Sequence, residues 1–396
     1  MVVSREAAPV PSCWDVIIVG AGPAGAAAAA TLARLGQRVL LLEERRAPRI
    51  KLGESLPPNA IGLVKHFLGD PEDSERLRDV FFRTAGNVAV WAGDEAQVGD
   101  FFFTSSGHGW CVERMAFDEA LRRAAVEAGT TLLTGARFLS SARSTDAAYT
   151  WQVEVATRTG QDLLHQCRYL IDASGRRAIV AKTLGVHDAD TDDQLFAYAQ
   201  WFSLQGDDED RYTRIEAVAH GWWYSNRLPR TEGEDSHRLV IMLSDADLPQ
   251  ARQAARADGY ERLLGETTHI ATLLAQKGYR ANGTLRGAPA NSRRLLSFCG
   301  DGWLAVGDAA QAYDPLSSQG IDKALRSASH AGHLVHYALS ERATDLTELG
   351  ADTPYLRQYA AEQDRLWRTY LSRRDYYYGL QPRWEDEPFW QRRRRR

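Results

Sequence analysis

The pattern of apolar positions changes twice near the start of the chain. Residues 16–19 form a continuous apolar run, which is typical of a central parallel strand buried on both faces. An alanine-rich stretch that follows three closely spaced glycines predicts a helix. Another strand is predicted at residues 38–42, where four apolar residues follow Arg38, and Glu43 closes it. This part of the chain is therefore predicted to fold as a strand-helix-strand unit.

The three glycines have a spacing with a known mechanical purpose. Gly20, Gly22 and Gly25 match G-x-G-x-x-G directly after the first predicted strand. The first glycine permits a tight turn, the second lets the main chain approach a pyrophosphate, and the third lets the helix pack close to the sheet. Glu43 lies at about the distance where an acid accepts hydrogen bonds from ribose hydroxyls. The unit is therefore predicted to bind an ADP moiety.

The same stretch also has the length of a membrane span. Residues 16–33 contain no charged side chain. The glycines and Pro23 divide this stretch into a strand and a helix, and no basic leader precedes it closely. We therefore expect neither a membrane helix nor a signal peptide here.

Four strand-like runs follow one another in the middle of the chain with no helical pattern between them. They cover residues 196–204, 214–219, 222–227 and 238–243. In the first run, Tyr198, Gln200 and Phe202 would share one face and Trp201 would lie on the other. The runs predict an antiparallel sheet, followed by a helical stretch near residues 259–277.

The first pattern then returns, which indicates discontinuous domains. Residues 302–310 are predicted to form a strand and a small-residue turn, a helix is predicted near Gly320, and residues 354–380 are helical by pattern. The predicted fold class is α/β, with a Rossmann-like nucleotide-binding domain, a second antiparallel-sheet domain and a helical C-terminal segment. The expected divisions are residues 1–80, 108–190 and 286–340 for the first domain, 81–107 and 191–285 for the second, and 341–396 for the helical segment.

Charge and cysteine content narrow the function classes. The net charge of −4 over 396 residues argues against a nucleic-acid-binding or membrane-surface protein. The acidic run at residues 206–211 and the arginines at 392–396 are expected to be solvated, with a partner-binding tail as the alternative. The four cysteines are far apart, which predicts a reducing, cytoplasmic compartment with no metal site and no redox dithiol. Eleven tryptophans could line a pocket for a flat substrate or pack in the core.

Three motifs in combination resemble one family. They are residues 20–25 with Glu43, the Asp172-Ala-Ser-Gly turn, and Val-Gly-Asp308-Ala-Ala followed by Asp314-Pro-Leu-Ser-Ser-Gln-Gly-Ile. Together they resemble the FAD-dependent monooxygenase superfamily, which has the p-hydroxybenzoate hydroxylase fold. The resemblance covers most of the chain.

Further motifs indicate a branch of this superfamily. Lys51-Leu-Gly-Glu-Ser and the closing residues Arg383, Trp384, Phe389 and Trp390 look like the branch that contains flavin-dependent halogenases. The Gly221-Trp-Trp-Tyr-Ser and Asp-Pro-Leu-Ser-Ser-Gln-Gly motifs look closer still to flavoproteins that help to mature tryptophylquinone-containing amine and amino-acid oxidases.

The resemblance implies FAD as the cofactor and a set of residues that contact it. The pyrophosphate would lie at the glycine turn and the ribose at Glu43. The flavin would lie beside Arg114, a strap loop that contains Glu54 and Ser55, and the amino end of the helix predicted near Gly320. The implied cofactor-binding residues are Gly20, Gly22, Pro23, Ala24, Gly25, Glu43, Glu44, Arg45, Glu54, Ser55, Arg114, Asp172, Gly175, Asp308, Gly320 and Ile321.

Three departures from the tryptophan halogenases concern their chemistry. Those enzymes have a lysine where this chain has Arg83, and Pro-Leu-Glu-Ser-Thr-Gly where this chain has Pro-Leu-Ser317-Ser-Gln319-Gly. Their W-x-W-x-I-P signature is here Trp222-Trp-Tyr-Ser-Asn-Arg-Leu-Pro. A guanidinium stays protonated and is weakly nucleophilic, so arginine cannot replace a lysine amine that captures or positions hypohalous acid. We therefore do not expect halogenation of tryptophan.

The resulting hypothesis is an FAD-dependent monooxygenase that transfers one oxygen atom from a flavin hydroperoxide to an electron-rich aromatic, either indole-like or a peptide tryptophan. Arg83, Ser318 and Gln319 are the candidate catalytic residues, and Trp91, Gln200, Trp222 and Trp223 are the candidate substrate-lining residues. Electrons would come from NAD(P)H, bound directly or through a separate flavin reductase. The alternatives are a halogenase of another aromatic, a flavin dehydrogenase or reductase, and a non-catalytic flavoprotein chaperone that docks on a protein.

Overall fold

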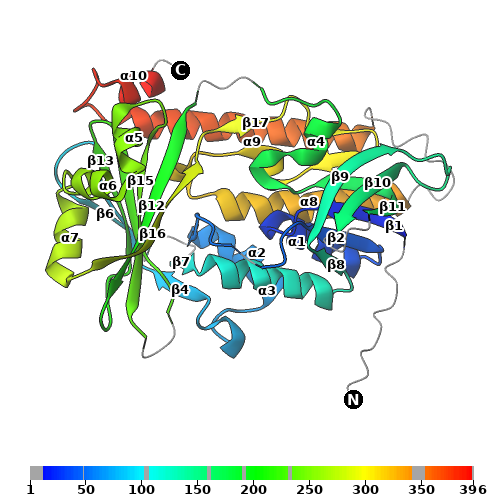
Figure 1. Ribbon diagram of the computed structural model, residues 1–396, viewed down its shortest axis with the longest axis horizontal. Coiled ribbons are helices and arrows are strands. Elements are labelled where there is room, and N and C mark those ends of the chain that lie inside the picture. Colours follow the sequence, from blue (N-terminus) through cyan, green and yellow to red (C-terminus); the bar gives the residue numbers. More distant parts are fainter. Residues whose placement is uncertain are drawn as a thin grey trace.

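Two large sheets organise the molecule and are joined along one side by a long helix (Figure 1). In the computed structural model, which describes residues 12–47, 49–101, 107–157, 162–189, 193–230, 234–340 and 353–394, one sheet has eight strands and the other has seven. Each sheet collects segments that are far apart in the sequence.

The eight-stranded sheet contains the glycine motif at the end of its first strand. Its main order is β18-β19-β11-β1-β2-β8, and β10 and β9 continue from β11. Strand β1 is parallel to β2 and β11, with Ile17 opposite Leu40 and Leu170. All three side chains are fully buried, as a two-sided parallel sheet requires. The strands are β1 (Cys13–Val19), β2 (Val39–Glu43), β8 (Thr131–Thr134), β9 (Ala136–Arg143), β10 (Trp151–Thr157), β11 (Asp162–Asp172), β18 (Cys299–Gly300) and β19 (Trp303–Ala305).

Helices with small residues pack around this sheet. Helix α1 (Pro23–Arg34) has a run of buried alanines, which lets α8 (Gly320–Ser340) and α3 (Arg114–Glu127) approach it closely. A Cβ at Gly332 of α8 would lie 2.8 Å from the Thr31 side chain of α1, so glycine is needed at this crossing. The smaller helices α2 (Ile61–Leu68) and α4 (Ile179–Thr183) complete this half.

The seven-stranded sheet is antiparallel except for one pair. Its order is β16-β12-β15-β14-β13-β5-β6, and only β13 and β5 pair in parallel among its described strands. The strands are β5 (Gly86–Val90), β6 (Gln97–Asp100), β12 (Leu195–Leu204), β13 (Tyr212–Val218), β14 (Gly221–Arg227), β15 (Ser236–Asp245) and β16 (Arg280–Pro289).

The two faces of this sheet have different coverings. One face packs on α5 (Pro249–Ala254), α6 (Ala257–Leu264) and α7 (His269–Lys277). The other face packs on the C-terminal helices α9 (Pro354–Gly379) and α10 (Pro388–Arg394). Tyr198 and Phe202 lie on the first face and Trp201 on the second, which confirms the alternation predicted for this strand.

Two small sheets connect the halves. Strands β3 (Ser55–Leu56), β7 (Gly109–Val112) and β4 (Phe81–Thr84) form one, and β17 (Arg293–Arg294) with β20 (Gln311–Ala312) forms the other. Strands β4 and β5 follow each other closely in the chain but belong to different sheets. A chain that leaves one sheet for another must interrupt its ladder of hydrogen bonds, and Ala85 occupies the break.

Helix α9 spans both halves of the molecule. At about 1.5 Å per residue, its 26 residues extend roughly 39 Å. Near its start, the Tyr359 hydroxyl donates to the main-chain oxygen of Ala305 in β19 at 2.7 Å. Near its end, the Tyr378 hydroxyl accepts from Nε1 of Trp222 in β14 at 3.0 Å. The helix therefore ties the two sheets to each other.

The α/β class, the Rossmann-like half, the antiparallel sheet and the C-terminal helices are confirmed, whereas the domain boundaries stay a prediction. The expectation of solvated charge runs is wrong in two places. Asp208 is 1% exposed, and Arg393 is buried against Asp245 because α10 packs on the sheet. Residues 395 and 396 lie outside the described residues. Within the described part of the chain, no helix has the length and apolarity of a membrane span.

Candidate functional site

The glycine turn after β1 has an open side. Gly20 has φ +105°, and a Cβ there would lie 2.5 Å from the Ala173 oxygen. A Cβ on Gly25 would overlap the Gly20 oxygen, so both positions require glycine. At Gly22, by contrast, the nearest atom to an added Cβ is Nζ of Lys51, 3.6 Å away. The middle glycine therefore faces space, while the outer two hold the turn against its neighbours.

Helix α1 begins at this open side. Its cap residue, Gly22, makes no side-chain capping bond, and Pro23 and Ala24 form the first turn. The uncapped N–H groups and the helix dipole at this end favour a negatively charged ligand. The arrangement therefore fits the pyrophosphate of a dinucleotide.

A partly buried ion cluster places a cation beside the turn. Nζ of Lys51 donates to Oδ2 of Asp118 at 2.8 Å, and Nη2 of Arg114 donates to Oδ1 of the same carboxylate at 3.2 Å. Burial alone would raise the pKa of Asp118, but Arg114 and Lys51 keep it below its ordinary value. Arg114 also donates to the main-chain oxygens of Leu52 and Gly53 at 2.6 and 2.8 Å. Arg114 therefore holds the strap loop. Lys51, which begins the Lys51-Leu-Gly-Glu-Ser motif, is a candidate phosphate ligand, a role that the sequence did not indicate.

Glu43 is held at the end of β2 by contacts with the glycine turn. Its Oε2 accepts from the Ala21 main chain at 3.2 Å, and its Oε1 accepts from the Arg45 main chain at 3.1 Å. Arg122 of α3 lies behind it, donating to the Ala21 oxygen at 2.8 Å. Glu44 instead pairs with Arg177 at 2.7 Å, which keeps the pKa of Glu44 low.

Glu54 and Ser55 lie where the strap loop enters β3. Glu54 is 2% exposed, and its Oε2 accepts from the Gly53 main chain at 3.1 Å. Burial raises the pKa of Glu54, although a hydrogen bond from Tyr224 of β14 opposes the rise. Ser55 pairs with Cys111 in the small sheet. The loop is therefore fastened to the antiparallel sheet on one side and to Arg114 on the other.

The turn that follows Asp172 packs against the glycine motif. Asp172 is fully buried, and its carboxylate accepts from the Ser174 hydroxyl at 2.6 Å and from the Ala181 main chain at 2.9 Å. One carboxylate oxygen therefore bonds to the turn and the other to helix α4, and Gly175 follows with φ +69°. Residue 172 shapes the turn against which Gly20 packs.

Asp308 and the start of α8 form the third part of the site. Asp308 accepts from Nζ of Lys323 at 2.8 Å, and Nε of Arg176 is 3.9 Å away. Burial opposes the charge of Asp308, but Lys323 and Arg176 keep its pKa below its ordinary value. Gly320, at the first position of α8, is exposed, and an added Cβ there would meet nothing within 4 Å. Ile321 next to it is buried.

Ser318 and Gln319 lie in the loop that leads into α8. Ser318 has φ +49°, a left-handed conformation that is uncommon for a residue other than glycine. Gln319 is half-buried, and its main chain donates to the Ser317 hydroxyl at 3.4 Å. Their catalytic role stays a prediction, but both lie directly before the predicted flavin contacts.

The structure divides the candidate substrate-lining residues between the two faces of the antiparallel sheet. Trp91 and Trp222 lie in one buried aromatic cluster, with ring centroids 6.2 Å apart. Leu52 of the strap loop and Leu316 of the loop before α8 pack on this cluster. Trp223 points to the other face, where its ring is 5.0 Å from that of Tyr260. Neighbouring residues of a strand point to opposite faces, which is why the two tryptophans separate.

Gln200 and Arg83 also lie apart from that cluster. Gln200 follows the alternation of its strand to the face covered by α5–α7, and its amide donates to the Asn282 oxygen at 2.8 Å. Arg83 lies on β4, where it pairs with Glu72 and its guanidinium is 5.7 Å from the ring centroid of Trp110. The Arg83 side chain is 46% exposed. The structure therefore groups Trp91 and Trp222 with the cofactor loops, but not Gln200, Trp223 or Arg83.

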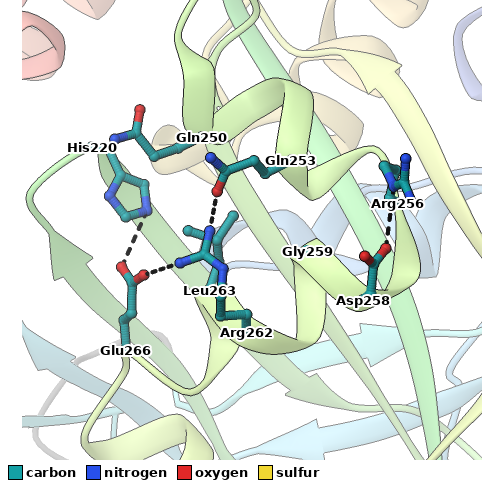
Figure 2. A pocket seen from close by; sticks show the side chains of 9 residues that line it. All are labelled: His220, Gln250, Gln253, Arg256, Asp258, Gly259, Arg262, Leu263 and Glu266. Atoms are coloured by element: carbon teal, nitrogen blue, oxygen red, sulfur yellow. Dashed lines mark hydrogen bonds and ion pairs between the residues drawn. The ribbon is translucent and has the colours of Figure 1, made fainter.

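A polar pocket of about 480 Å³ lies among the helices that cover the Trp223 face of the antiparallel sheet (Figure 2). Its charged groups bond to one another: Arg262 pairs with Glu266 at 3.1 Å, and Arg256 with Asp258 at 3.3 Å. It is lined by residues of α5, α6 and the adjoining turns and contains none of the predicted site residues. The pocket therefore does not belong to the cofactor site.

Comparison with known proteins places these features in a family. A family model described as FAD-dependent oxidoreductase matches residues 15–282. LodB of Marinomonas mediterranea, named as an FAD-dependent oxidoreductase, is 29% identical over 382 residues, covering 96% of each chain. The flavin-dependent halogenase armH3 of Armillaria mellea is 28% identical over 366 residues, covering 85% of this chain and 70% of the relative.

Solved structures with this fold include a halogenase and a dihydroxylase. The myxobacterial chondrochloren halogenase CndH superposes with a TM-score of 0.79 at 22% identity, covering 97% of this chain and 86% of CndH. The peptidyl tryptophan dihydroxylase QhpG, described as essential for tryptophylquinone cofactor biogenesis, has a TM-score of 0.66 at 24% identity, covering 96% and 78% of the two chains. At these identities the likeness establishes the fold alone.

Proposed function

Because the chain belongs to the family of FAD-dependent oxidoreductases, we propose that this oxidoreductase is a monooxygenase that transfers one oxygen atom to an electron-rich aromatic ring. We further propose that the ring is an indole, most specifically the side chain of a tryptophan in a peptide or protein. Support comes from the match with LodB along nearly the whole chain and from the fold shared with QhpG, which is named for action on peptidyl tryptophan.

The observation that favours oxygen transfer over halogenation is the state of the lysines. The chain has five lysines, and each one is ion-paired with an aspartate. The pairs are Lys51–Asp118, Lys65–Asp70, Lys182–Asp188, Lys277–Asp208 and Lys323–Asp308. Each lysine therefore has a carboxylate partner, and Arg83 stands at the position where the tryptophan halogenases have their lysine.

The residues that would hold FAD divide by the part of the cofactor that they suit. The open main chain at Gly22 and the Lys51 ammonium suit the pyrophosphate, and Glu43 suits the ribose. The strap loop held by Arg114 and the amino end of α8 suit the flavin ring. When bound, FAD would supply the activation of dioxygen, a reaction that amino-acid side chains do not perform.

The protein itself would contribute a favourable electrostatic environment for the flavin and a region from which water is excluded. The amino end of α8 favours negative charge next to it, which would stabilise an anionic reduced flavin. Trp91, Trp222 and the loop residues Leu52 and Leu316 form an apolar surface that excludes water on the same side. Electrons would come from NAD(P)H, either directly or through a separate flavin reductase, since the sequence shows no second G-x-G-x-x-G motif.

The test is a reconstituted reaction with mass spectrometry of the product. Purified holoprotein would receive a flavin reductase, NADH, oxygen and chloride, with indole, L-tryptophan and a peptide containing one tryptophan as separate substrates. A product heavier by one oxygen atom, which takes up label from ¹⁸O₂, is the expected result. A product with a chlorine isotope pattern, turnover without oxygen, or no turnover of any substrate would contradict the proposal.

Halogenation of an aromatic other than tryptophan is the second candidate. It is favoured by relatives such as armH3 and the 1H-pyrrole-2-carbonyl-[peptidyl-carrier protein] brominase of Pseudoalteromonas luteoviolacea, which is 26% identical over 333 residues. Repeating the reaction with bromide and with phenol and pyrrole substrates separates the two candidates, because only halogenation depends on the halide.

A further inference from the structure

We propose that the C-terminal helix α9 is part of the active site, and that Tyr378 and Asp314 are positioning residues that set the loop leading into α8. This inference deepens the proposed function and rests on it in one respect: the loop must adjoin the flavin. The two residues are 64 positions apart: Asp314 begins the Asp-Pro-Leu-Ser-Ser-Gln-Gly-Ile motif, whereas Tyr378 belongs to none of the motifs.

The Asp314 side chain folds the loop from within. Its Oδ1 accepts from the Leu316 main chain at 2.9 Å, and its own main-chain oxygen accepts from the Ser317 hydroxyl at 2.9 Å. These bonds close a 3₁₀ turn, Pro315–Ser317, which is followed by the left-handed Ser318. A left-handed residue other than glycine persists only where its surroundings impose it. The loop then ends at Gly320, the first residue of α8.

A single phenol fastens this loop to the antiparallel sheet. The Tyr378 hydroxyl donates to Oδ2 of Asp314 at 2.7 Å and accepts from Nε1 of Trp222 at 3.0 Å. All three side chains are at most 1% exposed. A buried phenol that both donates and accepts has one stable orientation, so the three groups form a rigid connection between β14, α9 and the loop.

Other charged and polar groups face Asp314 from the surrounding elements. From α9, the Tyr370 hydroxyl accepts from the Asp314 main chain at 2.9 Å, and Arg374 contributes a positive charge. Asp193 precedes β12 and repels a second negative charge, whereas Arg393 of α10 attracts it. Burial, followed by Asp193, raises the pKa of Asp314 to about 6.

The raised pKa of Asp314 predicts that this carboxyl group changes its charge near pH 6. Asp314 is protonated below about pH 6 and ionised above it, so its side chain gains a negative charge as the pH rises through that value. An ionised Asp314 adds a negative charge close to the start of α8, which opposes the addition of electrons to a flavin there. The reduction potential of bound FAD should therefore fall more steeply with pH on passing through about pH 6.

Three variants test the inference with FAD-loaded protein. Tyr378→Phe removes only the hydroxyl, Asp314→Asn removes the charge with little change of shape, and Tyr376→Phe is the matched control. Tyr376 lies two residues away on the same helix, and its side chain is 62% exposed. The measurements are the visible absorption spectrum and the reduction potential of bound FAD between pH 5 and pH 8, neither of which needs a substrate.

The wild type and the control should show a break in potential near pH 6, and Asp314→Asn should lack it. In Tyr378→Phe the break should move to higher pH, because the carboxylate loses a donor that stabilises its charge. With an active substrate, kcat of this variant should fall about tenfold with KM unchanged, the size of one lost hydrogen bond to a charged group.

Two results would overturn the inference. One is a wild-type potential with no break between pH 5 and pH 7. The other is that Tyr378→Phe and Asp314→Asn both match the Tyr376→Phe control in the visible absorption spectrum and in the pH dependence of the reduction potential of bound FAD. If no substrate is turned over but the potentials behave as described, the proposed function fails and the positioning role stands.

Discussion

Nη2 of Arg122 lies 3.5 Å from Oε2 of Glu43, and the same carboxylate oxygen accepts a hydrogen bond from the main chain of Ala21. The guanidinium thus joins helix α3 to the end of β2 and to the glycine turn. Its side chain is only 8% exposed, so this link is shielded from solvent and salt. The Arg122 side chain therefore fixes the position of Glu43 relative to the glycine turn, which are two separate parts of the predicted FAD site.

Substituting Arg122 should therefore weaken cofactor binding. We expect Arg122→Met to raise the Kd for FAD about tenfold, which corresponds to about 1.4 kcal/mol. The reason is that Glu43 would lose the positive partner that orients it and would have to be positioned by main-chain bonds alone. Quenching of flavin fluorescence on titration with apoprotein would measure the Kd. The adjacent and exposed Arg123 provides the control, and an equal effect of Arg123→Met would contradict the prediction.

Two glycines of the same turn should respond differently to alanine. Gly25→Ala should destabilise the protein, because the new Cβ would overlap the Gly20 oxygen. Gly22→Ala should leave the thermal unfolding temperature close to that of the wild type, because the added Cβ is 3.6 Å from its nearest neighbour, Lys51. It should nevertheless weaken FAD binding, since the methyl group occupies the open side of the turn. Parallel measurements of Tm without FAD and of Kd would separate the two effects, and wild-type affinity in Gly22→Ala would disprove the assignment.

The buried carboxylate of Asp208 should control acid stability. It receives Nη2 of Arg238 at 2.9 Å and the Tyr279 hydroxyl at 2.7 Å, and it also pairs with Lys277. Burial opposes the charge, but these partners lower the pKa of Asp208 well below its ordinary value. The stability it contributes is therefore complete above about pH 4 and is lost as pH falls toward the folded-state pKa.

Asp208→Asn should accordingly lower the free energy of unfolding at pH 7 by about 3 kcal/mol, because it leaves a buried arginine without one of its carboxylates. The difference between variant and wild type should shrink at pH 3. Urea unfolding at both pH values would measure it. Asp207→Asn is the neighbouring control: its side chain is 54% exposed, and it should cost less than about 1 kcal/mol. A loss that is the same at both pH values would refute the assignment to this ionisation.

The C-terminal helix α10 should be essential to stability. Trp390 is fully buried, its ring centroid is 5.4 Å from that of Trp91, and its Nε1 donates to the Val218 oxygen at 3.0 Å. Trp390→Ala should lower the free energy of unfolding by about 3–5 kcal/mol, the usual cost of removing a large buried aromatic. Leu380→Ala, at a position that is 42% exposed, is the control. Comparable losses in the two variants would show that burial at α10 is not the cause.

The local elements of this protein could be predicted from its sequence. The strand, glycine turn and helix at the start, the four consecutive strands and the long closing helix all follow from residue periods and turn residues that act within a few positions. The family motifs added the cofactor, which the match over residues 15–282 supports.

Only the tertiary structure decided which side chains meet. Lys51 reaches the glycine turn, Arg122 reaches Glu43, and Tyr378 reaches Asp314, and each of these contacts joins segments that no local pattern connects. Trp222 and Trp223 are neighbours in the sequence but lie on opposite faces of the antiparallel sheet, because adjacent residues on a strand point to opposite sides. Periodicity acts between neighbours along the chain, whereas a site is assembled by packing between elements, and packing depends on the whole fold.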